Sequence, residues 1–490
     1  MYDHKEAKIE WQSVPVIFPD DFASALFSRG ERAFKRCMMG DTDAAGFWKH
    51  MKEHSTWFQG NAMQSFPRLD KLIPFSLYGD DVQCYKNSEI GTCSIVAWTS
   101  DFAFKNSSLE RYFPICVWSE HCSTEFTHED VMEAVTERIR SMVDATFIHD
   151  WSSSGWAFVF SSIQGDLKWI RDHYNLFNFS ANDCCSLCGA VKSDPDVSWT
   201  IADFRPTAKH VGSAPDLTAF NLAPSVVFSL PGAGPDRVVH DCMHSQLLGT
   251  GKVSNGSGIV YLAESSFWND FQPSGTYPDA METSLRLAHK DFLQWKKSMG
   301  IKVTQPRFTP ARLSRKGRQS YACLSCKASP SKKIALWIAE RATTHATRQG
   351  ASEMDKLVAT CLKTYALSLQ LMDLAGLVLT RDEAERFYSL TMTHLQTFAL
   401  LNKKSRSLVG PKATGKNLWL LLPKHHHHFH CAIKVREERV NPRATSLFAG
   451  EDFIGRVSRI ARVCHRSTVS ERVLQRYLAL MHLQLPLRPG

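Results

Sequence analysis

Two aspartates, Asp80 and Asp166, follow apolar segments that are typical of buried strands, residues 72–78 and 156–165. Carboxylates that are distant in sequence and meet at strand ends are suitable ligands for hard divalent cations. Two such cations about 4 Å apart activate the attacking oxygen and stabilise the leaving oxygen when a phosphodiester is cleaved. An Asp after a strand is more often a turn residue or a helix cap. Only the joint position of the two residues therefore favours a site for Mg²⁺ or Mn²⁺.

A second set of residues has the spacing of a zinc site. Cys185 and Cys188 form a Cys-x-x-Cys pair, which is half of a tetrahedral zinc centre. The missing ligands can be Cys or His, and residues 423–430 contain an interrupted run of histidines. His426 and His430 are four residues apart, so they can share one helical face. The alternative is a redox-inert cysteine pair and an unrelated surface run of histidines.

The elements around Asp80 and Asp166 must bring these residues together. The pattern predicts three strands, a helix over 127–146 and a fourth strand from residue 156. This is the opening of the RNase H-like order, in which the first and fourth strands lie side by side and each presents an acidic residue. The first three strands are predicted at residues 72–78, 94–98 and 112–118.

The remaining chain reads as mainly helical. One helical pattern covers residues 22–51, and others follow at residues 285–299, 332–347, 352–379 and 381–401. We therefore predict an α/β protein whose RNase H-like core, a mixed sheet flanked by helices, is interrupted by a large helical insertion. The predicted segments are an N-terminal helical segment (1–68), the first part of the core with the Cys pair (69–245), the insertion (246–415) and a basic C-terminal part of the core (416–490).

Composition narrows the class of protein without identifying it. The chain has 490 residues, 43% of them hydrophobic, and a formal net charge of +9. That charge suits a polyanionic partner but is modest. The 14 cysteines are too irregular for a disulfide scaffold, and no apolar run approaches the ~18 residues that span a bilayer. We expect a reducing compartment and no membrane partner.

Six short segments follow one another along residues 70–480. They are 76–82 (Ser-Leu-Tyr-Gly-Asp-Asp-Val), 160–166 (Phe-Ser-Ser-Ile-Gln-Gly-Asp), 185–188 (Cys-Ser-Leu-Cys), 228–244 (Phe-Ser-Leu-Pro, then Arg-Val-Val-His-Asp-Cys-Met-His), 423–430 (Pro-Lys-His-His-His-His-Phe-His) and 448–455 (Phe-Ala-Gly-Glu-Asp-Phe-Ile-Gly). Their order resembles that of motifs in the transposases of CACTA-type (En/Spm-like) DNA elements, which belong to the RNase H-like DDE superfamily. The last segment resembles the block that supplies the catalytic Glu.

The resemblance implies a catalytic triad of Asp80, Asp166 and Glu451 that holds Mg²⁺ or Mn²⁺. Asp81 replaces the Gly that the family has after its first Asp, and Asp452 adjoins Glu451, so either neighbour can be the ligand instead. The proline typical after the second Asp is also absent.

The resemblance also implies a zinc set of Cys185, Cys188, His426 and His430, with His425 or His428 as substitutes because the register of the run is open. Zinc bound there would hold the exit of the insertion beside its entrance and help to place the catalytic Glu.

Asp241 and His244 match an Asp-x-x-His signature of cut-and-paste transposases. On one helical turn they face the same way, and we expect a buried Asp–His hydrogen bond that braces the helix. A direct catalytic or metal role is the alternative.

The expected function is a DNA transposase that cleaves and transfers strands of a cut-and-paste element. Its partners would be double-stranded transposon ends and target DNA, with a homo-oligomer possible in the DNA complex. It would work in the nucleus after synthesis in the cytoplasm. The alternatives are an inactive or domesticated DNA-binding derivative and another RNase H-like nuclease, acting on RNA–DNA hybrids. Phosphate contacts are expected from the basic final segment, from Arg436, Arg439, Arg443, Arg456, Arg459 and Arg462.

Overall fold

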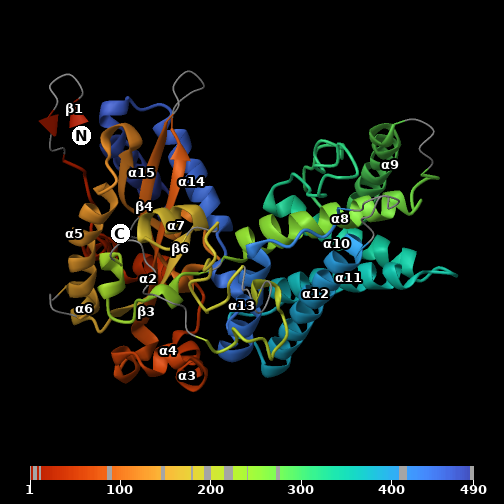
Figure 1. The fold of residues 1–490 in the computed structure, drawn as a ribbon. Coiled ribbons are helices and arrows are strands. Elements are labelled where there is room, and N and C mark those ends of the chain that lie inside the picture. The colour runs from red at the N-terminus through yellow and green to blue at the C-terminus, as the bar shows by residue number, and fades with distance from the viewer. Residues whose placement is uncertain are drawn as a thin grey trace.

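The computed structural model describes residues 13–84, 91–144, 149–177, 180–192, 200–213, 224–239, 241–271, 276–407 and 417–485, and the backbone of two short strands, β1 (Tyr2–Asp3) and β2 (Lys8–Ile9). Figure 1 shows two lobes, one built on a sheet and the other made of helices, with helix α13 between them. The described helices include none that is long and apolar enough to cross a membrane.

A four-stranded mixed sheet forms the centre of the first lobe, which makes the protein mixed α/β. The strands lie in the order β5-β4-β3-β6, and β3 pairs antiparallel with β4 and parallel with β6. The predicted adjacency of the first and fourth core strands is therefore confirmed. The four strands are β3 (Leu72–Gln83), β4 (Thr92–Ser100), β5 (Tyr112–Ser119) and β6 (Ala157–Gly165).

Helices cover both faces of the sheet, which is why its strands read as nearly continuous apolar runs. On one face, Phe22 of α1 (Pro19–Ser28) stacks on Phe113 of β5 at 4.7 Å. On the other face, Phe453 of α14 (Phe448–Ala461) stacks on Tyr112 at 5.4 Å and meets Tyr78 of β3 edge-on. The first face is also covered by α5 (Thr127–Val143), and the second by α15 (Val469–Gln484).

The N-terminal segment differs from its prediction. The single helical pattern over 22–51 is broken into separate helices, because Gly30 and Gly40 have φ values of 116° and 52° that a helix does not allow. The segments on either side of each break pack into the same hydrophobic core as the sheet. They are α1, α2 (Glu31–Met39), α3 (Ala44–His54) and α4 (Thr56–Gln59).

The second lobe is helical and has its own hydrophobic core, formed by residues between 253 and 419. Its large buried side chains include Trp337 and Trp419. The four helical patterns predicted there are confirmed as α9 to α12. In chain order this lobe contains the π-helix Met243–Thr250 (η10), α8 (Gly251–Glu264), α9 (Tyr277–Ser298), α10 (Ala328–Ala346), α11 (Glu353–Leu374) and α12 (Arg381–Ser407).

The chain then returns to the sheet through α13 (Pro423–Glu438), which packs along both the π-helix and α12. The sheet lobe is completed by α14 and α15, by α6 (Asp150–Ser153) and by α7 (Leu167–Tyr174), which begins directly after β6.

Candidate functional site

The two predicted aspartates lie at the same edge of the sheet. Gly79 and Gly165 are the last registered pair between β3 and β6, and each is followed by one of the aspartates. Neighbouring strands lie about 4.8 Å apart, so the backbones of Asp80 and Asp166 are close although 86 positions separate them in sequence. Asp166 also caps α7, because its Oδ1 accepts a hydrogen bond of 2.8 Å from the Lys168 N–H.

Strand geometry distinguishes Asp80 from Asp81. Side chains alternate along β3, so Asp80 shares a face with Tyr78, whose hydroxyl donates to Asp80 Oδ2 at 3.0 Å. That face carries α14. Asp81 points to the opposite face, is exposed, and accepts a hydrogen bond of 2.5 Å from Ser94. The geometry therefore favours Asp80 as the ligand of this pair.

Helix α14 presents Glu451 to the same edge. Gly450 lets the helix approach β3 closely, because a Cβ there would lie 3.0 Å from the ring of Tyr78. The neighbouring Asp452 is bound elsewhere: its Oδ2 accepts hydrogen bonds from Ser108 at 2.5 Å and Arg456 at 2.9 Å. Glu451 is thus the residue of the pair that faces the aspartates.

A histidine joins Glu451 to a buried carboxylate. His244 Nδ1 lies 2.9 Å from Asp241 Oδ2, and His244 Nε2 lies 3.4 Å from Glu451 Oε1. Asp241 also accepts hydrogen bonds from the backbone N–H groups of Met243, His244 and Leu447. It therefore fixes both the start of the π-helix and the residue before α14. The expected Asp–His bond is present, and it extends to Glu451.

The carboxylates influence one another electrostatically. Burial, together with the negative charges of Asp166 and Glu451, raises the pKa of Asp80 to about 7. Burial would lower the pKa of His244, but its hydrogen bonds to Asp241 and Glu451 outweigh that effect and raise the pKa to about 10. At pH 7 His244 is therefore a cation between two carboxylates. The pH then lies close to the pKa of Asp80.

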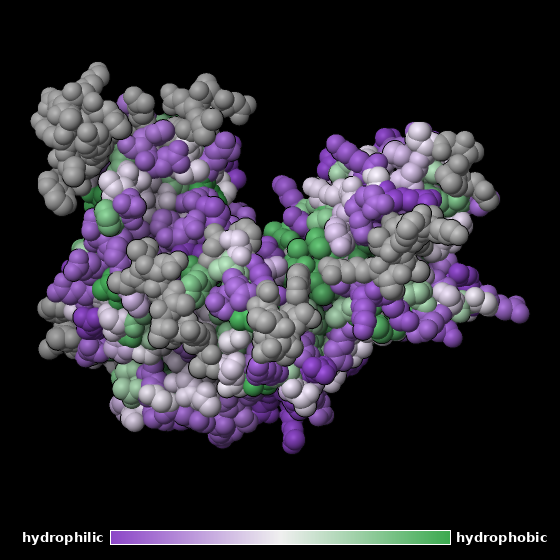
Figure 2. Space-filling model, viewed as in Figure 1, coloured by the Kyte–Doolittle hydropathy of each residue, from purple (hydrophilic) through white to green (hydrophobic). Residues whose placement is uncertain are grey.

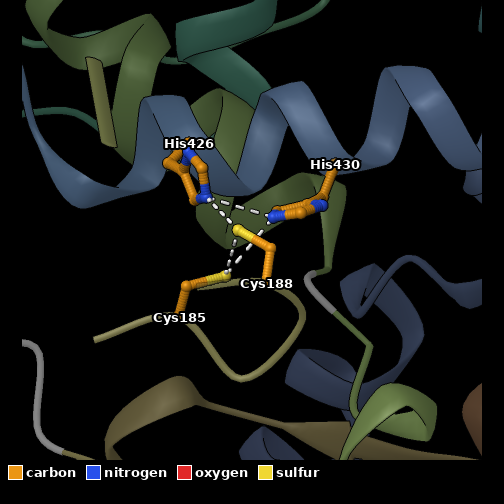
Figure 3. A group of neighbouring side chains, drawn as sticks. All are labelled: Cys185, Cys188, His426 and His430. Atoms are coloured by element: carbon orange, nitrogen blue, oxygen red, sulfur yellow. Dashed lines mark hydrogen bonds between the residues drawn. The ribbon is translucent and has the colours of Figure 1, made fainter. Parts of the chain in front are cut away.

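The zinc residues converge as a buried Cys₂His₂ group that can hold a metal such as zinc. Cys185 and Cys188 lie on a loop, and His426 and His430 project from one face of α13 (Figure 3). All four ligand atoms lie within 4.8 Å of one another. Among the described residues this is the one group of at least three Cys, His, Asp or Glu side chains that is so compact. The carboxylates of Asp80, Asp166 and Glu451 do not form a second.

The separations within this group match the edges of a zinc tetrahedron. Zn–S bonds of about 2.3 Å and Zn–N bonds of about 2.0–2.1 Å require edges of about 3.8 Å between sulfurs, 3.5 Å between sulfur and nitrogen, and 3.3 Å between nitrogens. The two sulfurs are 3.7 Å apart and the two Nε2 atoms 3.1 Å apart. Cys185 Sγ lies 3.3 Å from His430 Nε2, and Cys188 Sγ lies 3.2 Å from His426 Nε2.

The structure also settles the register of the histidine run. His425 turns back to the backbone of Leu422, and His428 lies in the helical lobe beside His394, 5.9 Å away between ring centroids. Neither can replace His426 or His430 at the sulfurs. Sequence reasoning missed His210, whose Nδ1 lies 3.8 Å from Cys188 Sγ, because no motif precedes it.

Two basic residues that sequence reasoning also missed lie between the clusters. Arg171 of α7 is buried and interacts electrostatically with both Asp166 and Cys185. Lys424, two residues before His426, interacts electrostatically with Asp166 and Asp241. Arg171 lies in an ordinary helical segment, and Lys424 lies in the segment 423–430, where only the histidines have side chains suited to zinc.

The predicted DNA-binding arginines lie in two groups. Those of α13 and the following turn lie at the C-terminal end of α13, which packs against α3. There Arg436 pairs with Glu385 at 2.9 Å and Arg443 with Asp373 at 3.7 Å, while Arg439 ends the helix with a φ of 51°. The others lie on α14 and just after it. Arg456 pairs with Asp452 at 2.9 Å, and Arg459 and Arg462 are exposed.

The candidate site thus consists of three carboxylates with a histidine link at the sheet edge, and a Cys₂His₂ group at the start of α13. Hard oxygen ligands and a tetrahedral sulfur–nitrogen set suit different cations, so the two clusters differ in the metal that each could hold.

A search against known protein families finds no match for this chain, and neither does a search of curated proteins.

Proposed function

We propose that this chain is a DNA transposase with an RNase H-like catalytic core, which cleaves and transfers DNA strands with divalent cations. The observation that carries the proposal is that Asp80 and Asp166 follow the neighbouring strands β3 and β6, with Asp166 and Glu451 near enough to Asp80 to influence its pKa. The strand order supports it, because the parallel neighbours β3 and β6 are the first and fourth strands of the core. In this view the helical lobe is an insertion between the second Asp and the Glu.

The residues fit hard divalent cations. Three carboxylates offer oxygen ligands of the kind that Mg²⁺ and Mn²⁺ prefer. Burial, and after it the negative charges of Asp166 and Glu451, raise the pKa of Asp80, and a bound cation would offset that repulsion. The cations would lower the pKa of an attacking water and stabilise charge on the leaving oxygen.

The chain's own residues would position the reacting groups. Asp80 and Asp166 are fixed by the pairing of β3 with β6, and His244 holds Glu451 through a bond that Asp241 orients. The first step would be hydrolysis of one strand at an element end, which frees a 3′-hydroxyl. That hydroxyl would then attack a phosphodiester of target DNA, forming a new ester bond and releasing the 3′-hydroxyl of the broken target strand. No covalent protein–DNA intermediate is needed, because positioning and charge stabilisation supply most of the rate.

The Cys₂His₂ group would hold zinc in a structural role. All four tetrahedral positions are occupied by protein ligands, which leaves no open position for a water or a substrate. Zinc there would tie the loop of Cys185 to α13, and α13 packs along the π-helix that carries His244. The metal would thereby stabilise the placement of Glu451 without contacting it.

The test is nicking of a supercoiled plasmid that carries the DNA flanking the gene, in Mg²⁺ or Mn²⁺. Asp166→Asn keeps the shape of the side chain and its capping oxygen but removes the charge that a hard cation needs. We expect it to lower nicking by at least about a thousandfold, as a loss of roughly 4 kcal/mol of transition-state stabilisation requires, while DNA binding persists. The matched control is Asp172→Asn on the outer surface of the same helix, which should nick like the wild type.

The outcomes distinguish the alternatives. A wild-type protein that binds DNA and never nicks it with either cation would be a DNA-binding derivative. Cleavage of RNA–DNA hybrids in preference to duplex DNA would indicate another RNase H-like nuclease. If Asp166→Asn nicks as fast as Asp172→Asn, the triad is wrong.

A further inference from the structure

The side chain of Lys424 packs closely against the π-helix. Its aliphatic stem crosses the π-helix at Gly249, where an added Cβ would lie 2.6 Å from Lys424 Cδ and 2.8 Å from Lys424 Cβ. The residue is half-buried, and no carboxylate among the described residues forms an ion pair with its ammonium group. Asp166 and Asp241 are nevertheless near enough to interact with it electrostatically.

Lys252 brings a second positive charge to the same place. It lies in the first turn of α8, and its carbonyl oxygen accepts a 2.9 Å hydrogen bond from the Leu324 N–H, which holds this turn in the helical lobe. Its charge is close enough to repel that of Lys424. In the described part of the chain, Lys252 also has no carboxylate partner. Two neighbouring, half-buried ammonium groups that have no described carboxylate within ion-pairing distance favour an anionic ligand.

Lys424 and Lys252 lie on elements beside the lobe that carries the carboxylates. Lys424 belongs to α13, which lies between the lobes, and Lys252 belongs to the helical lobe (Figure 1). Figure 2 shows the surface hollowed between the two lobes. By contrast, Arg436 and Arg439 follow Lys424 by 12 and 15 positions. At 1.5 Å per residue they lie about 18–22 Å farther along α13, away from the carboxylates.

We propose that Lys424 and Lys252 bind neighbouring backbone phosphates of the DNA strand that enters the Asp80–Asp166–Glu451 site. This inference rests on the proposed function and names residues that would deliver its substrate. Lysine binds phosphate as a compact point charge without reading bases, so the pair would position any sequence. The strand would run from the carboxylates across the hollow toward α8.

The test is the salt dependence of DNA binding by the full chain, with Ca²⁺ in place of the catalytic cations. The probe is a short fluorescent duplex of arbitrary sequence. Each phosphate contact contributes about −0.9 to the slope of log K against log salt. Lys424→Gln and Lys252→Gln should therefore each reduce the slope by about one and weaken binding roughly three- to tenfold near 0.1 M salt. Lys52→Gln on α3, at the far end of α13, is the matched control and should change neither quantity.

Two further variants separate charge from folding. Lys424→Arg keeps the charge and should keep the slope. Gly249→Ala changes no charge, but its new methyl group displaces the stem of Lys424, so it should reproduce part of the Lys424→Gln effect. Zinc content and thermal stability are measured for each variant. A Lys424→Gln protein that retains zinc and melts like the wild type has lost a contact and not its fold.

Competition identifies the source of the phosphate. Tripolyphosphate that displaces the duplex only at concentrations far above that of the DNA supports a nucleic-acid ligand. A preference for tripolyphosphate would overturn that assignment. Unchanged slopes in both Gln variants, or a wild-type chain that binds no duplex, would also overturn the inference. The proposed function is judged separately by nicking: a protein that binds through both lysines but never nicks would retain the phosphate pair and lose the enzyme.

Discussion

His244 contacts two carboxylates that come from distant parts of the chain. Asp241 is three residues before it, and Glu451 is 207 residues after it. Because Asp241 is buried and accepts three backbone N–H groups, the ring of His244 has little freedom to turn. An ionised His between two carboxylates lowers the repulsion that Glu451 would otherwise add to Asp80 and Asp166. The Asp-x-x-His signature therefore has a physical role beyond bracing its own helix.

The register of the histidine run gives a prediction at the scale of single side chains. His426→Gln should lower bound zinc from about one equivalent to near zero, because tetrahedral closure needs all four ligands. His425→Gln is its matched control. That residue is adjacent and buried but turns toward Leu422 instead of the sulfurs, so it should keep zinc. Metal analysis of protein purified without added zinc is the measurement.

A second pair of variants tests the cysteine ligands of the same zinc site. Cys188→Ser should also lose the metal. The chain has a second Cys-x-x-Cys pair, Cys323 and Cys326, and Cys323→Ser should retain the metal. Equal zinc in His425→Gln and His426→Gln would contradict the geometry of Figure 3.

At the scale of elements, two glycines control how closely the acidic strand ends approach each other. A Cβ at Gly79 would lie 1.8 Å from the ring of the buried Trp169 on α7, and one at Gly165 would lie 2.4 Å from the carbonyl oxygen of Gly79. Neither neighbour can move far, since one is a packed indole and the other is backbone. These glycines therefore fix the spacing of the strand ends that carry Asp80 and Asp166.

Gly165→Ala should destabilise the fold by roughly 3 kcal/mol or more, at the upper end of what overpacking usually costs. Gly79→Ala should cost a similar amount through Trp169. Gly317→Ala is the control, because no atom lies within 4 Å of its new methyl group, and it should stay within about 0.5 kcal/mol of wild type. Urea unfolding gives the three values. Equal midpoints for Gly165→Ala and Gly317→Ala would show that the strand ends can separate without cost.

The same scale shows what the sequence could and could not predict. The core strands β3 to β6 and helices α9 to α12 were predicted because their apolar patterns are long and regular. The break at Gly30 was missed, because the apolar spacing continues across it while the backbone does not. Asp80 and Asp81 could not be separated without knowing which sheet face carries α14. The contact of His244 with Glu451 and the placement of Lys424 depend on packing between lobes, which no local pattern encodes.

At the scale of the whole molecule, buried neutral histidines occur in both lobes. Burial lowers the pKa of His128, in the sheet lobe, to about 3 and that of His394, in the helical lobe, to about 4. Burial also lowers the pKa of His425 to about 3 and holds the pKa of His428 well below its ordinary value. An unfolded chain would protonate all four near pH 6.5.

The sign of the effect follows from proton binding. Between the folded and unfolded pKa values the unfolded state binds more protons, so stability falls as pH falls below about 6.5. At pH 5 a histidine with a folded pKa of about 4 loses roughly 2 kcal/mol of its contribution. Asp80, Asp101 and His244 have raised pKa values and act in the opposite sense, since the folded state holds their protons better. The four buried histidines outweigh these three groups, and we expect net acid destabilisation.

The last prediction isolates one histidine. His128 packs against Trp118, Trp169 and the ring of His173, so His128→Phe keeps an aromatic ring there and removes the titration. The difference in unfolding free energy between pH 7.5 and pH 5 should therefore shrink by roughly 2 kcal/mol relative to wild type. His465→Gln, at an exposed site, should leave that difference unchanged. Urea unfolding followed by tryptophan fluorescence measures it, and a difference in His128→Phe as large as that of the wild type would mean that His128 already accepts its proton in the folded protein.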